Sequence, residues 1–267
     1  MVRFVSFGSG SSGNCYYLYT ETDGLLIDAG VGYRTLRKGF TECGLSLSSI
    51  HNIIITHEHA DHVKAVGKVS EECGAPVYAT ATVHTGIERN CCVHTKISGS
   101  LVRTIQKGKT VGIGGFNVTP FDVPHDSLDN VGYSIECGGV TFCLVTDAGT
   151  VTNEIKRHIR AADYLVIEAN HDVTMVEQGR YPRFLKERIL SDRGHLSNDA
   201  CGRTIAQCAT YRLKGVWLCH LSGENNDPDT ARGTVEEILL DAGIMSAFNF
   251  RLDVLRRRTL EGPYELK

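Results

Sequence analysis

The chain has 267 residues, is 42% apolar and carries a formal net charge of −3. This size supports one large domain with its own core, or at most two small ones. The mild negative charge excludes the overall basic surface that drives non-specific nucleic-acid binding, so any such contact has to come from a local patch. The chain starts with a strand-like stretch rather than a signal peptide, and it has no apolar run of about 18 residues, so we expect a cytoplasmic protein that makes no membrane contact.

Apolar β-rich runs alternate with helical stretches from one end of the chain to the other. The pattern predicts strands at 2–7, 15–20, 25–28, 53–56, 77–79, 116–123, 131–136, 140–146, 164–168 and 216–219. It predicts helices at 32–43, 62–73, 80–90, 152–161, 183–190, 198–211 and 228–242. We therefore expect a single α/β domain over residues 1–267, with two sheets covered by helices. The ten cysteines include no CxxC pair, which favours free thiols over disulfides or a cysteine-based zinc site.

The stretch His57-Glu58-His59-Ala60-Asp61-His62 follows the predicted strand 53–56. On an extended backbone His57 and His59 point to the same side and can bind one metal ion, while Asp61 and His62 lie past the turn and can reach a second one. Without a cation, gathering so many polar groups would carry a high desolvation cost. The alternative, a polar loop after a buried strand, explains the composition less well.

Three further candidate ligands each follow an apolar strand, namely His125, Asp147 and His220. Alone, each is a weak signal, because a single His after a strand is more often a solvated or capping residue. Together they are informative, because functional groups on open α/β scaffolds gather at the carboxyl ends of the strands. We therefore expect all three to converge on the motif at 57–62.

One assignment distributes these ligands over two divalent ions. His57, His59 and His125 bind the first ion, Asp61, His62 and His220 bind the second, and Asp147 bridges both beside a shared nucleophilic water. The two cations would outweigh the two carboxylates and a bridging hydroxide, so the site suits an anionic substrate. Imidazole ligands suit Zn²⁺ and carboxylate with water suits Mn²⁺, so either metal fits.

The motif at 57–62, followed in order by His125, Asp147 and His220, resembles the metallo-β-lactamase fold superfamily over essentially the whole chain. The resemblance implies a four-layer αββα sandwich with a dinuclear site at the edge between the sheets. His59 stands where the flavodiiron branch usually carries Glu, which favours hydrolysis over redox chemistry. The segment 148–219 is too short to hold a β-CASP insertion.

Shorter segments narrow the resemblance. These segments lie at 8–14, 124–126, 146–149, 168–172, 194–198 and 220–222. Taken together, their sequences resemble those of the YycJ (WalJ) family of bacterial nuclease-like proteins, which are distant relatives of ribonuclease Z. This resemblance implies a metal-dependent phosphodiesterase, an exonuclease that cleaves DNA by attack of the metal-bridging hydroxide. The alternative is a small-molecule hydrolase of the same fold, acting on a thioester or lactone in a closed pocket. The oligomeric state stays open.

Two more residues complete the predicted chemistry. His195 precedes a predicted helix and resembles the proton-donating His of ribonuclease Z, and Glu168 matches the carboxylate that orients it. A plain helix-flanking role is the alternative for His195. Asp61 belongs to the catalytic set as well as to the metal set. His171 or Asp172 is a further candidate for supporting a metal ligand.

Substrate contacts are predicted from small polar residues and from basic clusters. The loop at 8–14 can present N–H groups and hydroxyls to a phosphate, and the predicted substrate-binding residues are Ser9, Ser11, Ser12, Asn14 and Ser222. Basic residues gather at 180–193 and at 34–38, where they can attract a polyanion. Arg256, Arg257 and Arg258 read as a solvated strand end.

Overall fold

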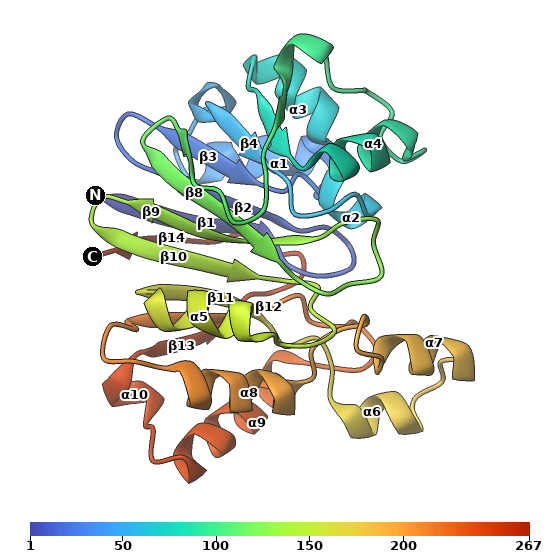
Figure 1. Ribbon diagram of the computed structural model, residues 1–267, viewed down its shortest axis with the longest axis vertical. Coiled ribbons are helices and arrows are strands. Elements are labelled where there is room, and N and C mark those ends of the chain that lie inside the picture. Colours follow the sequence, from blue (N-terminus) through green and yellow to red (C-terminus); the bar gives the residue numbers. More distant parts are fainter.

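The computed structural model describes the backbone of residues 1–267 and every side chain except those of residues 246 and 247. Its strands form two seven-stranded sheets that pack against each other (Figure 1). The first has the order β14–β1–β2–β3–β4–β5–β6, with bounds Glu261–Leu266, Val2–Gly8, Cys15–Tyr19, Gly24–Ile27, Asn52–Ile54, Val77–Ala79 and Val102–Thr104. The second has the order β13–β12–β11–β10–β9–β8–β7, with bounds Arg251–Val254, Gly215–Cys219, Tyr164–Glu168, Val140–Val145, Val131–Cys137, Phe116–Asp122 and Val111–Ile113.

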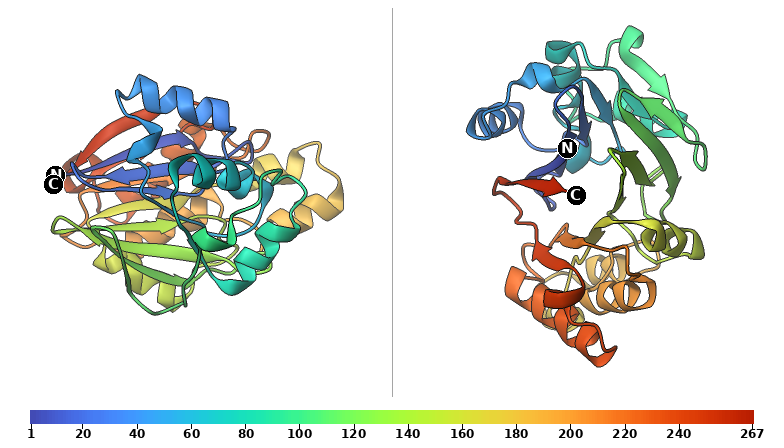
Figure 2. Two further views of the ribbon diagram at one scale, coloured as in Figure 1. Left: turned by 90° about the horizontal axis from the view of Figure 1, so that it is seen from above. Right: turned by 90° about the vertical axis from the view of Figure 1, so that its left-hand side faces the viewer.

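Helices cover the outer face of each sheet and complete four layers (Figure 2). The first sheet is covered by α1 (Tyr33–Glu42), α3 (Val66–Cys73) and α4 (Ala81–Arg89). The second is covered by α5 (Asn153–Ala161), α8 (Asn198–Cys208) and α9 (Pro228–Asp241). The short helices are α2 (Ala60–Val63), α6 (Val173–Gln178), α7 (Arg183–Ile189), α10 (Ser246–Asn249) and the 3₁₀ turns Leu47–Ser49 and Gly99–Leu101. The predicted αββα sandwich is confirmed.

Alternating side chains of the strands build the layers. Along β1, Phe4 points between the sheets, where its ring centroid lies 4.9 Å from that of Trp217 on the second sheet. Its neighbour Val5 and the next outward residue, Phe7, face the helical layer, and Phe7 stacks on Phe40 of α1 at 4.8 Å. Each fully buried side chain of this size contributes about 1.5–3 kcal/mol. Because successive side chains point to opposite faces, β1 contributes apolar side chains both to the layer between the sheets and to the layer under the helices.

Strand direction decides where the polar residues meet. In the first sheet β3 and β4 are parallel, and in the second β10, β11 and β12 are parallel, while β8 and β10 both pair antiparallel with β9. Within each sheet these strands, apart from β9, run in one direction, and the contacts between donors of the two sheets place their carboxyl ends at the same end of the sandwich. The residues that follow them there are Asp28, His57, His125, Asp147, the strand-ending Glu168 and His220.

Some elements differ from the expectation. The predicted helix 62–73 is divided into α2 and α3, because Ala65 N–H donates to the Ala29 carbonyl, outside the helix, at 3.0 Å. The edge strands β6, β7, β13 and β14 and the helix α6 were not predicted. Strand β14 contains Gly262 and Pro263, which an edge strand tolerates because one of its sides needs no ladder hydrogen bonds. None of the described helices has the length and apolar character needed to cross a membrane.

Candidate active site

The motif at 57–62, which follows β4, passes from non-helical backbone into the helix α2. His59 has an extended backbone and directly precedes the first turn of α2, and His57 lies two residues earlier, outside any helix or strand. Asp61 and His62 belong to α2, and their side chains join a second group of donors. The structure brings His57 and His59 together with His125, whose nitrogen donors all lie within 4.8 Å of one another.

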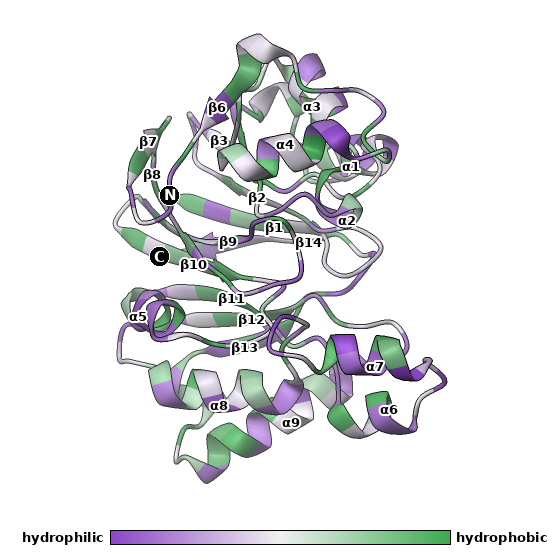
Figure 3. Ribbon diagram, turned by 45° about the vertical axis from the view of Figure 1, so that its right-hand side comes forward, coloured by the Kyte–Doolittle hydropathy of each residue, from purple (hydrophilic) through white to green (hydrophobic). Residues whose placement is uncertain are grey.

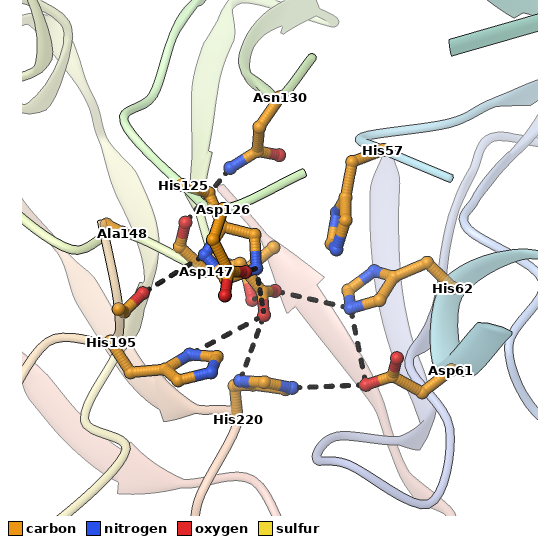
Figure 4. Close-up of polar contacts among 12 residues, drawn as sticks. His57, Asp61, His62, His125, Asp126, Asn130, Asp147, Ala148, His195 and His220 are labelled. Atoms are coloured by element: carbon orange, nitrogen blue, oxygen red, sulfur yellow. Dashed lines mark hydrogen bonds and ion pairs between the residues drawn. The ribbon is translucent and has the colours of Figure 1, made fainter. Parts of the chain in front are cut away.

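A second group of donors lies beside the first. Asp61 and His62 meet His220, again with donor atoms within 4.8 Å. The Asp147 carboxylate lies between the two groups (Figure 4): its oxygens are 3.2 Å from His62 Nε2 and 3.8 Å from His125 Nε2. The donors of His57, His62 and Asp147 also lie within 4.8 Å of one another, so the two groups adjoin, and their division between two ions stays a prediction.

Two buried ring nitrogens show what the first group can hold. Among the described residues, His57 Nε2 and His125 Nε2 have no hydrogen-bond partner. Their other ring nitrogens are held, at 3.1 Å from Thr56 Oγ1 and at 3.0 Å from the Gly194 carbonyl. His125 Nε2 faces the carboxylates of Asp126 and Asp147 at 3.3 and 3.8 Å. A buried imidazole nitrogen that makes no hydrogen bond and is oriented from its far side is the donor that a divalent cation needs. These residues therefore fit a metal ion.

Glu168 connects several parts of the site. Its Oε1 lies 2.8 Å from Nδ1 of both His195 and His220, and its Oε2 accepts hydrogen bonds from the N–H groups of Ala148 and Leu196. Burial alone would raise the pKa of this carboxyl group, but the two histidines lower it to about 2. Glu168 thus stays ionised and orients a predicted metal ligand as well as the predicted proton donor. Sequence reasoning had paired it with His195 alone.

Asp28 was missed as a functional residue. It is fully buried, and its Oδ2 lies 2.7 Å from His62 Nδ1, while Oδ1 accepts a hydrogen bond from the backbone N–H of Thr56. This contact leaves His62 Nε2 to face Asp147. The sequence pattern that indicated Asp147, an acidic residue just after an apolar strand, applies equally to Asp28.

Backbone strain gathers at the site. The structure describes three non-glycine residues with positive φ, Asp28 at 59°, Asp147 at 54° and His220 at 56°. Each follows a strand whose carboxyl end faces the site. This conformation costs about 1–3 kcal/mol per residue and persists where surrounding contacts hold it. The fold therefore places these side chains at the expense of local stability.

The two groups of histidines differ in their protonation. Burial lowers the pKa of His57 and that of His125, so both imidazoles are neutral. Burial also opposes the charged form of His62 and His220, but neighbouring carboxylates, Asp147 first, hold the pKa of His62 well above its usual value and raise that of His220 to about 10. A metal ion entering the second group has to displace these protons.

The predicted substrate-binding residues separate into three environments. Ser11 and Ser222 line a cleft of about 280 Å³ together with the candidate ligands. Ser9 and Asn14 are fully buried: Ser9 Oγ accepts from His220 N–H, and Asn14 Nδ2 lies 2.9 Å from His62 Nε2. They support the site from behind rather than facing a substrate. Ser12 lines a different cavity.

The basic cluster at 180–193 supplies Arg188 to the cleft and Arg193 to the loop behind it, whereas Tyr181 was not predicted. Tyr181 and Arg188 line the cleft from the α6–α7 segment, which projects from the sandwich (Figure 3). Arg193 donates to the His125 carbonyl from Nε and Nη2, at 2.9 and 2.7 Å, and so fixes that loop. Asp172 caps α6 through the Met175 N–H, whereas His171 is buried beside it. Position relative to a strand end does not single out Tyr181, because it lies on an excursion between strands, and charge does not single it out either.

Comparisons with known proteins agree with this geometry. A family model described as a β-lactamase superfamily domain matches residues 24–220. The exodeoxyribonuclease YycJ of Bacillus anthracis is 33% identical over 242 residues, 91% of this chain and 90% of that protein. The exodeoxyribonuclease WalJ of Streptococcus pneumoniae is 34% identical over 250 residues, 94% and 93% of the two chains. The crystal structure of the metallo-β-lactamase fold protein YhfI from Bacillus subtilis superimposes with a TM-score of 0.72 at 16% identity, covering 98% of this chain and 100% of that one.

The fold and the cluster of His and Asp residues at its edge define a metal-dependent hydrolase. The chain belongs to the metallo-β-lactamase superfamily and, within it, to the YycJ/WalJ family. The expected resemblance is thereby confirmed.

Proposed function

We propose that this protein is an exonuclease that hydrolyses DNA phosphodiester bonds with two divalent metal ions. One arrangement carries the proposal: two sets of metal-binding side chains share Asp147 beside the His195–Glu168 pair. The relatives that are named exodeoxyribonucleases support DNA as the polymer and its cleavage from an end.

The residue roles follow from the two sets. In this proposal His57, His59 and His125 hold the first ion and Asp61, His62 and His220 hold the second. Asp147, whose oxygens lie within 4 Å of His62, His125 and His220, contributes to both. The imidazoles suit Zn²⁺ and the carboxylates suit Mn²⁺, so both metals belong in the test. When bound, such ions supply a nucleophilic water at neutral pH and neutralise charge on the phosphate.

His195 is the proposed proton donor to the leaving oxygen. Its Nδ1 is engaged by Glu168 at 2.8 Å, so Nε2 is the ring nitrogen available to the cleft that His195 lines. Burial would lower the pKa of this imidazole, but the Glu168 carboxylate raises it above its usual value. Glu168 therefore favours the imidazolium form, which is the form that donates a proton.

The shape of the cleft favours a polymer over a small ester. It continues into a neighbouring hollow of about 430 Å³ that shares His59, Asp61 and Arg188 with it. Arg89 adds a cation to that hollow, where Arg188 is paired with Asp126. The ring of Tyr181 in the cleft offers a surface for a base to stack on. A thioester or lactone hydrolase needs a closed pocket instead.

The experiment is a metal-dependent cleavage assay. Chelator-treated protein is reloaded with Zn²⁺ or Mn²⁺ and incubated with end-labelled DNA, matched RNA and bis-p-nitrophenyl phosphate. We expect mononucleotides to be released from one end of DNA only when metal is present. His59→Ala should abolish this release, while the control His94→Ala, an exposed histidine outside the site, should not. Absence of metal-dependent DNA cleavage would refute the nuclease proposal, and cleavage of esters alone would favour the alternative.

A further inference from the structure

A cavity of about 370 Å³, separate from the cleft and its neighbouring hollow, lies on the far side of the loop at 8–14. Ser11 faces the catalytic cleft, whereas the next residue, Ser12, lines this cavity, so the loop separates the two spaces. Lys64, Arg257 and Arg258 contribute three cations to its lining. Lys64 directly follows α2, and the two arginines come from the connection between β13 and β14, which crosses from one sheet to the other.

These three cations have no acidic partner among the residues that the structure describes. Among the described residues, neighbouring Arg256 reaches Glu261 at 4.0 Å, but Lys64, Arg257 and Arg258 form no ion pair within that distance. Lys64 Nζ donates one hydrogen bond, to the Ser12 carbonyl at 2.7 Å, and keeps two further N–H groups. A cavity with three uncompensated positive charges attracts an anion.

Arg257 is the most constrained of the three. It was expected to be solvated, but it is half-buried, and its Nε is inaccessible and has no hydrogen-bond partner among the described residues. It packs on two glycines: a Cβ on Gly223 would lie 2.0 Å from Nη1, and one on Gly10 would lie 3.0 Å from Cγ. A guanidinium partly removed from water and without an acceptor carries a desolvation penalty. A phosphate supplies paired acceptors for the two terminal Nη groups of this planar guanidinium.

The first turn of α1 adds to the same field. Gly32, which precedes the helix, and Thr35 both line the cavity. Gly32 provides no side-chain cap, and the first turn contains no acidic residue. The free N–H groups and the positive end of this ten-residue helix are therefore available to an anion.

We propose that this cavity binds a phosphate of the nucleic-acid strand whose scissile bond lies in the catalytic cleft. The inference rests on the proposed nuclease function, because it makes the cavity a second contact for the same substrate. Since Ser11 and Ser12 are adjacent, a strand that crosses the loop passes from one space directly into the other. The cavity thus gives a protein of net charge −3 a local site for a polyanion.

The kinetic test uses the double variant Arg257→Gln/Arg258→Gln, the single variant Lys64→Gln and the control Arg157→Gln. Arg157 lies on α5, which covers the outer face of the second sheet, and its side chain is 70% exposed. We expect the double variant to raise KM for a single-stranded oligonucleotide at least tenfold, with kcat retained. Turnover of bis-p-nitrophenyl phosphate, which occupies the cleft alone, should stay within twofold. The dependence of log KM on log salt should lose about 0.7 per abolished phosphate contact.

Two results would overturn this inference. One is an unchanged KM and salt dependence for the oligonucleotide in the double variant. The other is an equal loss on both substrates, which would mean that the arginines act on the cleft itself. Oligonucleotides with a 5′-phosphate, a 3′-phosphate or neither identify the source of the phosphate: equal effects assign an internal phosphodiester, and an end-dependent effect assigns a terminal phosphate.

A binding measurement separates this inference from the proposed function. If wild-type protein hydrolyses bis-p-nitrophenyl phosphate but no nucleic acid, the nuclease proposal fails while the cavity stays testable. Fluorescence anisotropy with a labelled oligonucleotide and metal-free protein then decides. Binding that weakens at least tenfold in the double variant but not in Arg157→Gln supports the cavity. Absence of binding, or equal binding by all variants, overturns it.

Discussion

The half of the candidate site that lies on the first sheet comes from one stretch, residues 57–62, whereas the half on the second sheet is assembled from separated segments. Each half is anchored by a buried carboxylate at a strand end. Asp28 contacts one histidine, His62, while Glu168 contacts two, His195 and His220. The comparison teaches that the buried carboxylate of the first half reaches a single candidate metal ligand. The buried carboxylate of the second half contacts a candidate metal ligand and the proposed proton donor at once.

The largest effect is expected at the residue that both halves share. Asp147→Asn removes a negative charge that lies within 4 Å of His62, His125 and His220. Activity on DNA should fall about 10³-fold or more, because bound metal contributes several kcal/mol to catalysis. Steady-state kinetics and metal analysis of the same preparation test this. Full metal content with near-normal turnover would mean that Asp147 does not belong to the two sets.

The next effect isolates proton donation in the second half. His195→Ala should lower kcat on DNA about 10²-fold or more, because the leaving alkoxide then lacks a positioned acid. Bis-p-nitrophenyl phosphate should lose only a few-fold, because p-nitrophenolate leaves without being protonated. Rate ratios for the two substrates, measured at saturating metal, provide the readout. Equal losses on both would instead assign His195 to the metal or to the fold.

Glu168→Gln tests the link itself and predicts a change in the pH profile. The Glu168 carboxylate stabilises the His195 imidazolium and raises its pKa. The proton donor has to be charged, so activity is lost as pH rises through that pKa. Removing the anion lowers the pKa, and the alkaline limb of the kcat profile should move to lower pH, together with a loss of about 10–100-fold in activity. A profile that falls uniformly without shifting would contradict the proposed link.

Asp28→Asn is the matched change in the first half and should have the smallest effect. It weakens the orientation of His62 alone, so metal affinity should fall about tenfold. Excess metal should restore most of the activity, and the alkaline limb of the kcat profile should stay in place. Metal titrations of activity, run in parallel with Glu168→Gln, measure this. A shifted alkaline limb in Asp28→Asn would remove the distinction between the two halves.

The same contrast explains what the sequence could predict. The motif at 57–62 is local, so its spacing alone indicates metal binding. His125, Asp147 and His220 became predictable through strand ends, because parallel strands deliver such residues to one edge. Asp28 obeyed the same rule but has no other signal, since one acidic residue after a strand is ordinary.

Other features depend on contacts that spacing does not encode. Ser9 and Asn14 lie in the expected loop, but its backbone turns them into the protein. His220 is the second partner of Glu168 because β11 and β12 pair in parallel, which places Glu168 beside Cys219, the residue before His220. Arg257 became half-buried because the unpredicted edge strand β14 returns the chain to the first sheet, beside the loop at 8–14.

The most direct test of the account is the metal content of the reloaded protein, measured by mass spectrometry on wild type, His59→Ala and His220→Ala. The account predicts two divalent ions per wild-type chain and the loss of one ion in each variant, with His94→Ala unchanged. A wild-type protein that is fully active with a single ion, or that keeps both ions in the two site variants, would contradict it.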